Sequence, residues 1–414
     1  MISKFFSKSF HKSDLLIYTL SLFHTVKHIF NSSFNILIPY IKEGMFLNNL
    51  QIGILVGVQQ VFSGIANIPA GIITDIFRKT LGIMLATSML FVSIGFLFLS
   101  IANYYILILI GASLLSIGAS LWHAPAFSIL SNRFPNKKAY ALGVHISGAS
   151  AGDSLGPLFG GLLLGGISLG ALKWAGLGWK SICFINFIPC LLISIILLLY
   201  SNKLMNPEIK NVKFSNYFKN AFSSLKKTGV LVMVMLHAIR GATHQSFSVY
   251  LAIYLKEYLM YSSFFIGIHL ALLTLAGIVF TPVLGLVSDK IGRLPIIIFG
   301  FAMTSLMIAM ILLVNSGISL IIMLIVLGSV LFSIMPIISA YAMDTAGKMN
   351  EGSSIAFLFT GGSIAGAIAP VIAGIFFDKW GFDGLIVFTV SLSLLGLLIV
   401  ISYTLYDSLR NKFI

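Results

Sequence analysis

The chain has 414 residues, of which 58% are hydrophobic and only 9% are charged, with a mean hydropathy of +1.02. This leaves too little polar surface for a soluble globular protein and indicates an integral membrane protein. The formal net charge of +14 raises the possibility of nucleic-acid binding, which depends on where the charges lie.

Long apolar runs separated by short charged loops predict an all-α membrane protein with twelve transmembrane helices. In chain order the predicted helices cover residues 15–40, 50–76, 81–101, 105–131, 139–166, 179–200, 229–255, 264–287, 294–314, 317–345, 354–377 and 384–405.

The first predicted helix is apolar enough to span a bilayer and yet carries a polar stripe. At 3.6 residues per turn one face collects His24, Lys27, His28, Asn31 and Asn35. Lys27 lies roughly 18 Å from the start of the helix, near the middle of a hydrocarbon layer about 30 Å thick. A cation at that depth must face protein or water, so it marks a functional site.

The seventh predicted helix repeats this pattern with His237, Arg240 and His244. Lys27 and Arg240 are 213 residues apart, and we expect them to face each other across a central cavity. Their shared sign points to an anionic substrate such as a phosphate, phosphonate or carboxylate, which arginine can bind with two parallel hydrogen bonds.

Further pairs of similar residues recur at the same spacing, which indicates two pseudo-symmetric six-helix halves. Gly53 recurs as Gly267 and Asp75 as Asp289, both 214 residues later, while Pro157 recurs as Pro370 after 213. We therefore predict halves at residues 1–200 and 229–414 with a site between them. The basic segment 201–228 is interpreted as a cytoplasmic linker, either an amphipathic helix lying on anionic lipid or a solvated connection.

The basic residues are distributed unequally between the two sides of the membrane. If both termini lie in the cytoplasm, only Lys42, Lys173, Lys180, Lys256 and Lys379 fall outside. This asymmetry follows the positive-inside rule and predicts an inner-membrane protein with cytoplasmic termini. The net charge is then explained by topology, and no nucleic-acid partner is expected.

Two loops that join predicted helices share a pattern of glycine, aspartate and basic residues. The residues are Gly71, Asp75 and Arg78 in the first half and Gly285, Asp289 and Arg293 in the second. Such contacts can latch a gate, in which glycine permits close helix approach and the carboxylate pairs with a cation or a helix N-terminus. The alternative is that they only anchor the loops at the membrane surface.

The second of these loops resembles the signature of the major facilitator superfamily between its eighth and ninth helices. The resemblance extends over essentially the whole chain, and the fragments Leu22–His24, Gln51–Gly57 and Leu121–Ala126 look most like the fosmidomycin-resistance type of efflux carrier. It implies alternating access in a secondary transporter.

The fifth predicted helix resembles the antiporter signature of the same superfamily. It contains Gly143, Gly152, Gly156, Pro157, Gly160 and Gly161. Closely spaced glycines allow helices to pack together and the proline bends the helix, so ordinary packing explains them as well.

Asp153 lies among these glycines, with His145 two turns before it. We consider two roles for Asp153: a proton carrier, with His145 assisting, or a fixed counter-ion to Lys27. The fourth predicted helix lacks the arginine that drug:proton antiporters of the superfamily often carry. Any proton coupling would then use Asp153 or the histidines, among which His123 is a further cavity candidate.

The histidine spacings are compatible with metal binding, but Lys27 and Arg240 would repel a bare cation, so no metal site is predicted. No phosphate-binding loop or nucleophile motif is present in the sequence, and we expect neither an enzyme nor a cofactor.

The sequence therefore predicts a monomeric secondary transporter for a small organic anion, coupled to protons or to a counter-transported anion. Two alternatives stay open. One is a proton-driven exporter of drugs or antibiotics, whose pocket should be aromatic. The other is a membrane receptor or scaffold that does not transport.

Overall fold

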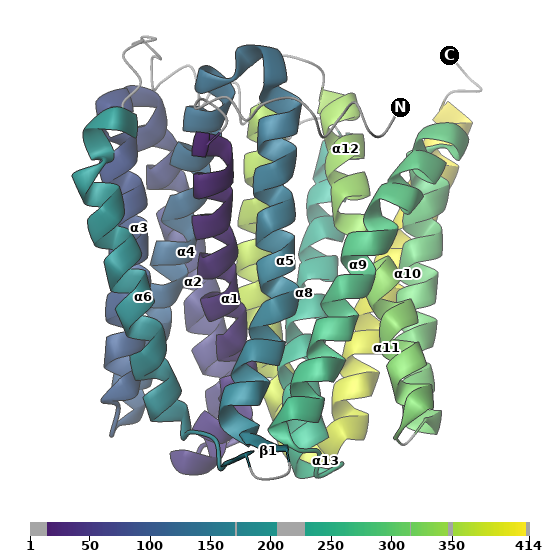
Figure 1. The fold of residues 1–414 in the computed structure, drawn as a ribbon. Helices are drawn as coiled ribbons and strands as arrows, with labels where there is room; N and C mark the ends of the chain where they lie inside the picture. The colour runs from purple at the N-terminus through teal and green to yellow at the C-terminus, as the bar shows by residue number, and fades with distance from the viewer. Residues whose placement is uncertain (1–14, 170–171, 205–227, 315, 347–350, 411–414) are drawn as a thin grey trace.

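The computed structural model describes residues 15–169, 172–204, 228–314, 316–346 and 351–410. The linker from 205 to 227, where an amphipathic helix is expected, lies outside these residues, as does the basic segment 1–14. The described helices stand side by side as one bundle of nearly parallel rods (Figure 1).

The first half contains α1 (Leu15–Gly44), α2 (Asn49–Ile76), α3 (Leu81–Ser100), α4 (Tyr105–Arg133), α5 (Lys138–Gly165) and α6 (Trp179–Leu199). The second half contains α8 (Thr228–Glu257), α9 (Ser263–Ile291), α10 (Arg293–Met310), α11 (Ile318–Leu331), α12 (Ile334–Ala346) and α13 (Glu351–Arg410). Short 3₁₀ turns cover Arg78–Thr80, Pro135–Lys137, Ser201–Leu204 and Ile311–Leu313.

Two predicted helix boundaries differ from the observed ones. The predicted helix 317–345 is interrupted between α11 and α12, because Pro336 near the start of α12 has no N–H to continue the ladder. The helices predicted at 354–377 and 384–405 form the single element α13, which turns back at Gly381 with φ of 65°. Counting α11 with α12 once and α13 twice, the described helices make the twelve expected crossings.

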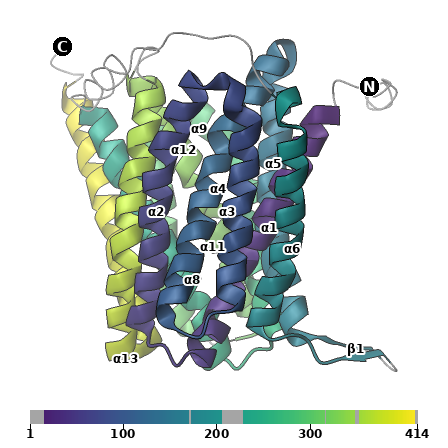
Figure 2. The ribbon, with the colours of Figure 1, turned by 90° about the vertical axis from the view of Figure 1, so that its left-hand side faces the viewer.

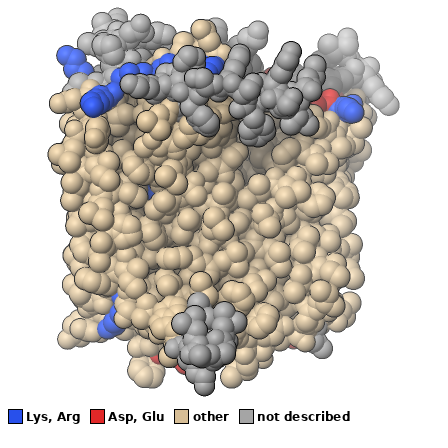
Figure 3. Space-filling view, in the orientation of Figure 1, with Lys and Arg blue, Asp and Glu red and all other residues tan. Residues whose placement is uncertain are grey.

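Eight described helical stretches are long and apolar enough to cross a membrane by composition alone. The helices α1, α5 and α8 are not among them, and these are the helices that carry Lys27, Asp153 and Arg240. On the surface in Figure 3, charged residues gather at the two ends of the bundle and the middle is nearly free of charge. This is the surface expected of a protein surrounded by lipid.

A hairpin that the sequence analysis did not predict joins α5 to α6. Its strands β1 (Ile167–Leu169) and β2 (Leu172–Trp174) are antiparallel, and the hairpin projects from the end opposite the termini (Figure 2). Gly166 and Gly176 flank it with positive φ values of 72° and 81°. We call this end of the bundle the hairpin end and the other the termini end.

The two halves meet along two interfaces that are related by the internal repeat. A Cβ atom placed on Gly53 of α2 would lie 2.4 Å from the carbonyl oxygen of Pro370 in α13. A Cβ atom on Gly267 of α9 would lie 2.4 Å from the carbonyl oxygen of Pro157 in α5. Glycine therefore allows the backbones of the two halves to touch at equivalent places.

Charged side chains also join the halves at the hairpin end. Lys42 of α1 donates to Glu257 of α8 at 2.7 Å, and Lys256 of α8 pairs with Glu43 of α1. Asp378 of α13 accepts hydrogen bonds from the first backbone N–H groups of α2. Among the described residues, the ion pairs between the halves lie at this end, so the hairpin end is closed.

The glycines of α5 pack that helix against α1 within the first half. Cβ atoms on Gly152, Gly156 and Gly160 would lie 2.4 to 2.6 Å from atoms of α1, and one on Gly161 would meet Ser263 of the second half. Gly143, in contrast, has open space around it.

We predict that Gly152→Ala lowers the melting temperature of the protein in detergent, because its methyl group would collide with the carbonyl oxygen of Thr25. The matched control Gly143→Ala should leave the melting temperature unchanged or raise it, since alanine favours helix by about 1 kcal/mol. Thermal unfolding followed by size-exclusion chromatography measures both. Equal effects of the two substitutions would contradict this packing.

Candidate functional site

The polar stripe of α1 faces α4 and α5, where it meets further histidines. The imidazole of His24 stacks on that of His145, with ring centroids 4.0 Å apart, and on the indole of Trp122 at 5.7 Å. Trp122 donates from Nε1 to Nε2 of His145 at 3.3 Å. His123 of α4 lies edge-on to His24 at 5.3 Å. His28 lies 4.7 Å from His24, centroid to centroid, so the first half gathers four histidines in one place.

Asp153 is joined to this cluster by short hydrogen bonds. Its Oδ1 lies 2.8 Å from Nδ1 of His28 and accepts a second bond from Ser32 Oγ at 2.5 Å. Both partners come from α1, so the close packing at Gly152 brings the carboxylate of α5 onto the stripe. The described partners of Asp153 are therefore His28 and Ser32, and not Lys27 as a direct counter-ion.

Lys27 and Arg240 occupy equivalent places in the two halves. Lys27 is 0% exposed and its Nζ donates to the carbonyl oxygen of Ala119 in α4 at 3.1 Å. Arg240 is 7% exposed and its Nε donates to the carbonyl oxygen of Leu331, at the end of α11, at 2.9 Å. Each cation also lies near an aromatic ring, Trp122 at 5.8 Å and Phe332 at 5.7 Å respectively.

This arrangement differs from the expectation that the two cations face each other across a cavity. In this structure each lies inside its own half and neither lines the central cavity described below. The physical reason is that a buried cation needs a fixed acceptor close by, and helix carbonyl oxygens of the same half supply one.

The remaining histidines of the second half do not form a cluster. His237 lies against Phe359 at 5.7 Å, and its buried Nδ1 has no hydrogen-bond partner among the described residues. His244 meets the edge of Phe332 at 4.8 Å. The pseudo-symmetry therefore holds for the cations and not for the histidines.

The central cavity, of about 400 Å³, lies beside the polar stripe of the first half, and Gln245 of α8 borders it from the second half. It is lined by His28, Asn31, Ser32, Phe34, Asn35, Gln59, Gln60, Ser63, Leu115, Ser116, Ala119, Asp153 and Gln245. The lining holds one aromatic ring, and amide and hydroxyl groups predominate. The buried Oδ1 of Asn31 has no hydrogen-bond partner among the described residues.

Sequence reasoning named His28, Asn31, Asn35 and Asp153 near this cavity and missed the glutamines. Gln59 and Gln60 are adjacent in the middle of α2, and Gln245 follows His244 in α8. These amides could have been recognised as cavity residues from the sequence, because a polar side chain at membrane depth is costly to leave facing lipid.

The structure describes the side chains of only some of the predicted gating residues. Arg293 donates to Asp344 of α12 at 2.5 Å and to Asp289 at 3.1 Å, which ties three helix ends of the second half together. Gly71 and Gly285 have open space around them, so neither makes the close helix contact that we expected. The side chains of Asp75 and Arg78 lie outside the described residues.

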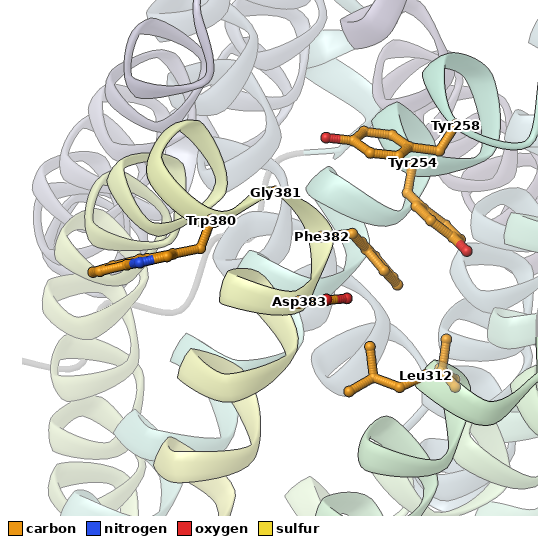
Figure 4. A pocket seen from close by; sticks show the side chains of 8 residues that line it. Tyr254, Tyr258, Leu312, Trp380, Gly381, Phe382 and Asp383 are labelled. Carbon is orange, nitrogen blue, oxygen red and sulfur yellow. The ribbon is translucent and has the colours of Figure 1, made fainter.

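A second cavity of about 310 Å³ lies where α13 turns back at Gly381 (Figure 4). It is lined by Tyr254, Tyr258, Ile311, Leu312, Trp380, Gly381, Phe382 and Asp383. Figure 4 shows the ring of Phe382 beside that of Tyr254, and the two rings stack at 3.5 Å. None of the predicted site residues lines it.

Comparison with protein families gives one match, which covers nearly all of the chain. The model of the Major Facilitator Superfamily matches residues 20–258 and 233–412. No curated protein matches this chain.

Solved structures with a similar fold include two transporters. A bacterial homolog of the human lysosomal transporter Spinster, inward-facing and unoccupied, is 17% identical, with a TM-score of 0.76 over 95% of this chain and 96% of that chain. The nucleoside transporter NupG is 12% identical, with a TM-score of 0.73 over 95% of this chain and 98% of that chain. At these identities the similarity concerns the fold.

The cavity can be tested by cysteine labelling, because both native cysteines, Cys183 and Cys190, are fully buried. We predict that Ser116→Cys reacts with a hydrophilic maleimide in detergent, whereas Ser88→Cys, at a fully buried position on α3, does not. Mass spectrometry of the intact protein measures the labelling. An unreactive Ser116→Cys would show that the cavity is not open to solvent.

Proposed function

Because this chain belongs to the Major Facilitator Superfamily, we propose that it is a secondary active transporter which binds a small polar organic anion in the central cavity and moves it by alternating access. The observation that carries the proposal is the cavity lining, which is rich in amides and hydroxyls and comes from the first half, with Gln245 from the second. Such groups hydrogen-bond phosphate, phosphonate or carboxylate oxygens, with amide and hydroxyl hydrogens as the donors.

The charges of the buried core favour a negatively charged solute. Among the described residues at membrane depth, Lys27 and Arg240 contribute two positive charges and Asp153 one negative charge. The Asp153 carboxylate is already bound by His28 and Ser32. In a medium of low dielectric the surplus positive charge attracts an anion into the adjoining cavity without direct contact.

The binding residues of this proposal are Asn31, Gln60 and Gln245. His28 also lines the cavity, but both of its ring nitrogens already have partners, Asp153 and His24. Lys27 and Arg240 act through their field while they remain bound to helix carbonyls. His24, His123, His237 and His244 do not line the cavity and are not assigned to direct solute contact in this state.

Alternating access requires that the contacts which close one end break when the other closes. The ion pairs Lys42–Glu257 and Lys256–Glu43 close the hairpin end, so we propose that they form an outer gate. The Asp289, Arg293 and Asp344 cluster, together with the pattern that contains Gly71, Asp75 and Arg78, is proposed for the opposite gate.

We propose that coupling to protons or to a counter-transported anion passes through Asp153, because it is the carboxylate that lines the cavity. His145 supports it indirectly by stacking on His24. If the termini face the cytoplasm, as the distribution of basic residues predicts, the hairpin end with its ion pairs between the halves faces outward.

A drug exporter fits the cavity less well, since a pocket for amphiphilic drugs should be lined by several aromatic rings and this one has Phe34 alone. A receptor or scaffold with the same fold would not exchange solute. Counterflow in proteoliposomes, with the anion selected by the screen below, separates a transporter from a receptor.

We predict that small organic phosphates, phosphonates or carboxylates raise the melting temperature of the purified protein, whereas neutral nucleosides and sugars of the same size do not. The reason is the surplus positive charge of the core. A thermal-shift screen over anions of graded size and charge measures this. Equal stabilisation by neutral solutes would contradict the proposal that the solute is an anion. It would not contradict the proposal that a polar solute binds in the cavity.

We further predict that Lys27→Gln and Arg240→Gln each abolish the stabilisation by the anion that the screen selects, without preventing membrane insertion. Each variant removes one positive charge from the low-dielectric core. Lys180→Gln is the control, because Lys180 bonds Asn103 at the exposed end of α6. Unchanged affinity in either core variant would refute the role of the cations.

A further inference from the structure

Three histidine side chains in the first half lie close enough to share one ligand. His24 and His28 are one turn apart on α1, and His123 comes from α4. One ring nitrogen of each lies within 4.8 Å of the corresponding nitrogens of the other two. Among the described residues this trio has the spacing of a metal site.

The hydrogen bonds of His24 and His28 fix which ring nitrogens carry hydrogen. Nδ1 of His24 lies 3.1 Å from the carbonyl oxygen of His145, which can only accept, so this nitrogen is the donor. Nδ1 of His28 lies 2.8 Å from Oδ1 of Asp153, a carboxylate oxygen that also accepts from Ser32. In both neutral rings the hydrogen is then on Nδ1 and the lone pair is on Nε2.

The two nitrogens that carry these lone pairs lie next to each other, in rings that meet edge to face with centroids 4.7 Å apart. Nε2 of His28 lies 3.2 Å from Nε2 of His24, which is hydrogen-bonding distance. Two lone pairs at this distance repel, so the arrangement is stable only when a positive centre lies between them. That centre is either an additional proton or a metal ion.

The distance and the outer hydrogen bonds both match metal coordination. Two imidazole nitrogens bound at about 2.0–2.1 Å to a tetrahedral zinc ion lie roughly 3.3 Å apart. Metal-binding histidines also donate their other N–H to a carboxylate or a backbone carbonyl, which holds the ring in place. Here the Asp153 carboxylate accepts from His28, and the His145 carbonyl oxygen accepts from His24.

We propose that His24, His28 and His123 bind a divalent transition-metal ion of the zinc type through their ring nitrogens, with Asp153 and the His145 carbonyl as outer partners. Imidazole is a ligand for zinc, copper, nickel and iron, and not for magnesium or calcium. Three protein ligands leave a fourth coordination position for water or a solute group.

The site adjoins the solute cavity through His28, which lines it and gives the ion a route of entry. The repulsion by Lys27 that argued against a metal in the sequence is reduced in two ways. Its ammonium group is bound to the Ala119 carbonyl, and the Asp153 carboxylate lies next to His28. The inference does not depend on the charge of the transported solute.

The test uses the full-length protein without a polyhistidine tag, stripped of metal by a chelator and exchanged into chelator-free detergent buffer. Zinc ions are titrated calorimetrically, and cobalt ions are titrated by the visible absorption that tetrahedral coordination intensifies. We expect one high-affinity metal ion per chain, and a loss of affinity of at least tenfold in His28→Gln and in His123→Gln. Asp153→Asn should weaken binding about 10- to 100-fold, as outer partners typically do.

His269→Gln is the matched control. His269 is a buried histidine whose Nδ1 donates to the carbonyl oxygen of Phe265, as His24 does to His145, but no histidine accompanies it among the described residues that could hold a metal. This variant should bind metal like the unchanged protein. His123→Gln leaves both Nδ1 hydrogen bonds in place, so it keeps the test valid if His28→Gln fails to fold.

The proposal is overturned if the unchanged protein binds neither zinc nor cobalt, because the centre between the two rings is then a proton. It is also overturned if His28→Gln and His123→Gln bind as tightly as His269→Gln. Neither result bears on the transporter proposal, which the anion screen tests separately.

Discussion

The cost of placing a charge at the middle of a bilayer governs this structure. A cation there needs a fixed acceptor, and the fold supplies one twice, by directing Lys27 at the Ala119 carbonyl and Arg240 at the Leu331 carbonyl. The same requirement accounts for the lower apolar content of α1, α5 and α8, which are not among the eight most apolar helical stretches and which carry Lys27, Asp153 and Arg240. In each half the helices therefore pack so that a backbone carbonyl oxygen lies beside the buried cation.

Glycine allows the helices to approach closely, and hydrogen bonds between helices need short distances between their backbones. The contact of Gly152 with Thr25 brings Asp153 within reach of His28 and Ser32. The contacts of Gly53 with Pro370 and of Gly267 with Pro157 join the halves at equivalent positions. Each repeated glycine therefore meets the repeated proline of the other half, so the two interfaces are equivalent.

Much of the fold was predictable because hydropathy and the internal repeat act on whole helices. The turn at Gly381 and the hairpin after Gly165 were not, since they depend on local backbone geometry. At the site, the sequence identified the residues of the polar stripe but placed Lys27 and Arg240 facing each other. The spacing of residues along the sequence shows which side chains share one face of a helix. It does not show which neighbouring helix supplies the hydrogen-bond partner of each side chain, because that depends on how the helices pack.

The reciprocal pairs Lys42–Glu257 and Glu43–Lys256 have a consequence for how the protein responds to its surroundings. Glu43 in particular is well exposed, so the attraction that holds the hairpin end shut is weakened by dissolved ions. The ionic strength on that side of the membrane therefore sets how strongly these pairs hold the two halves together.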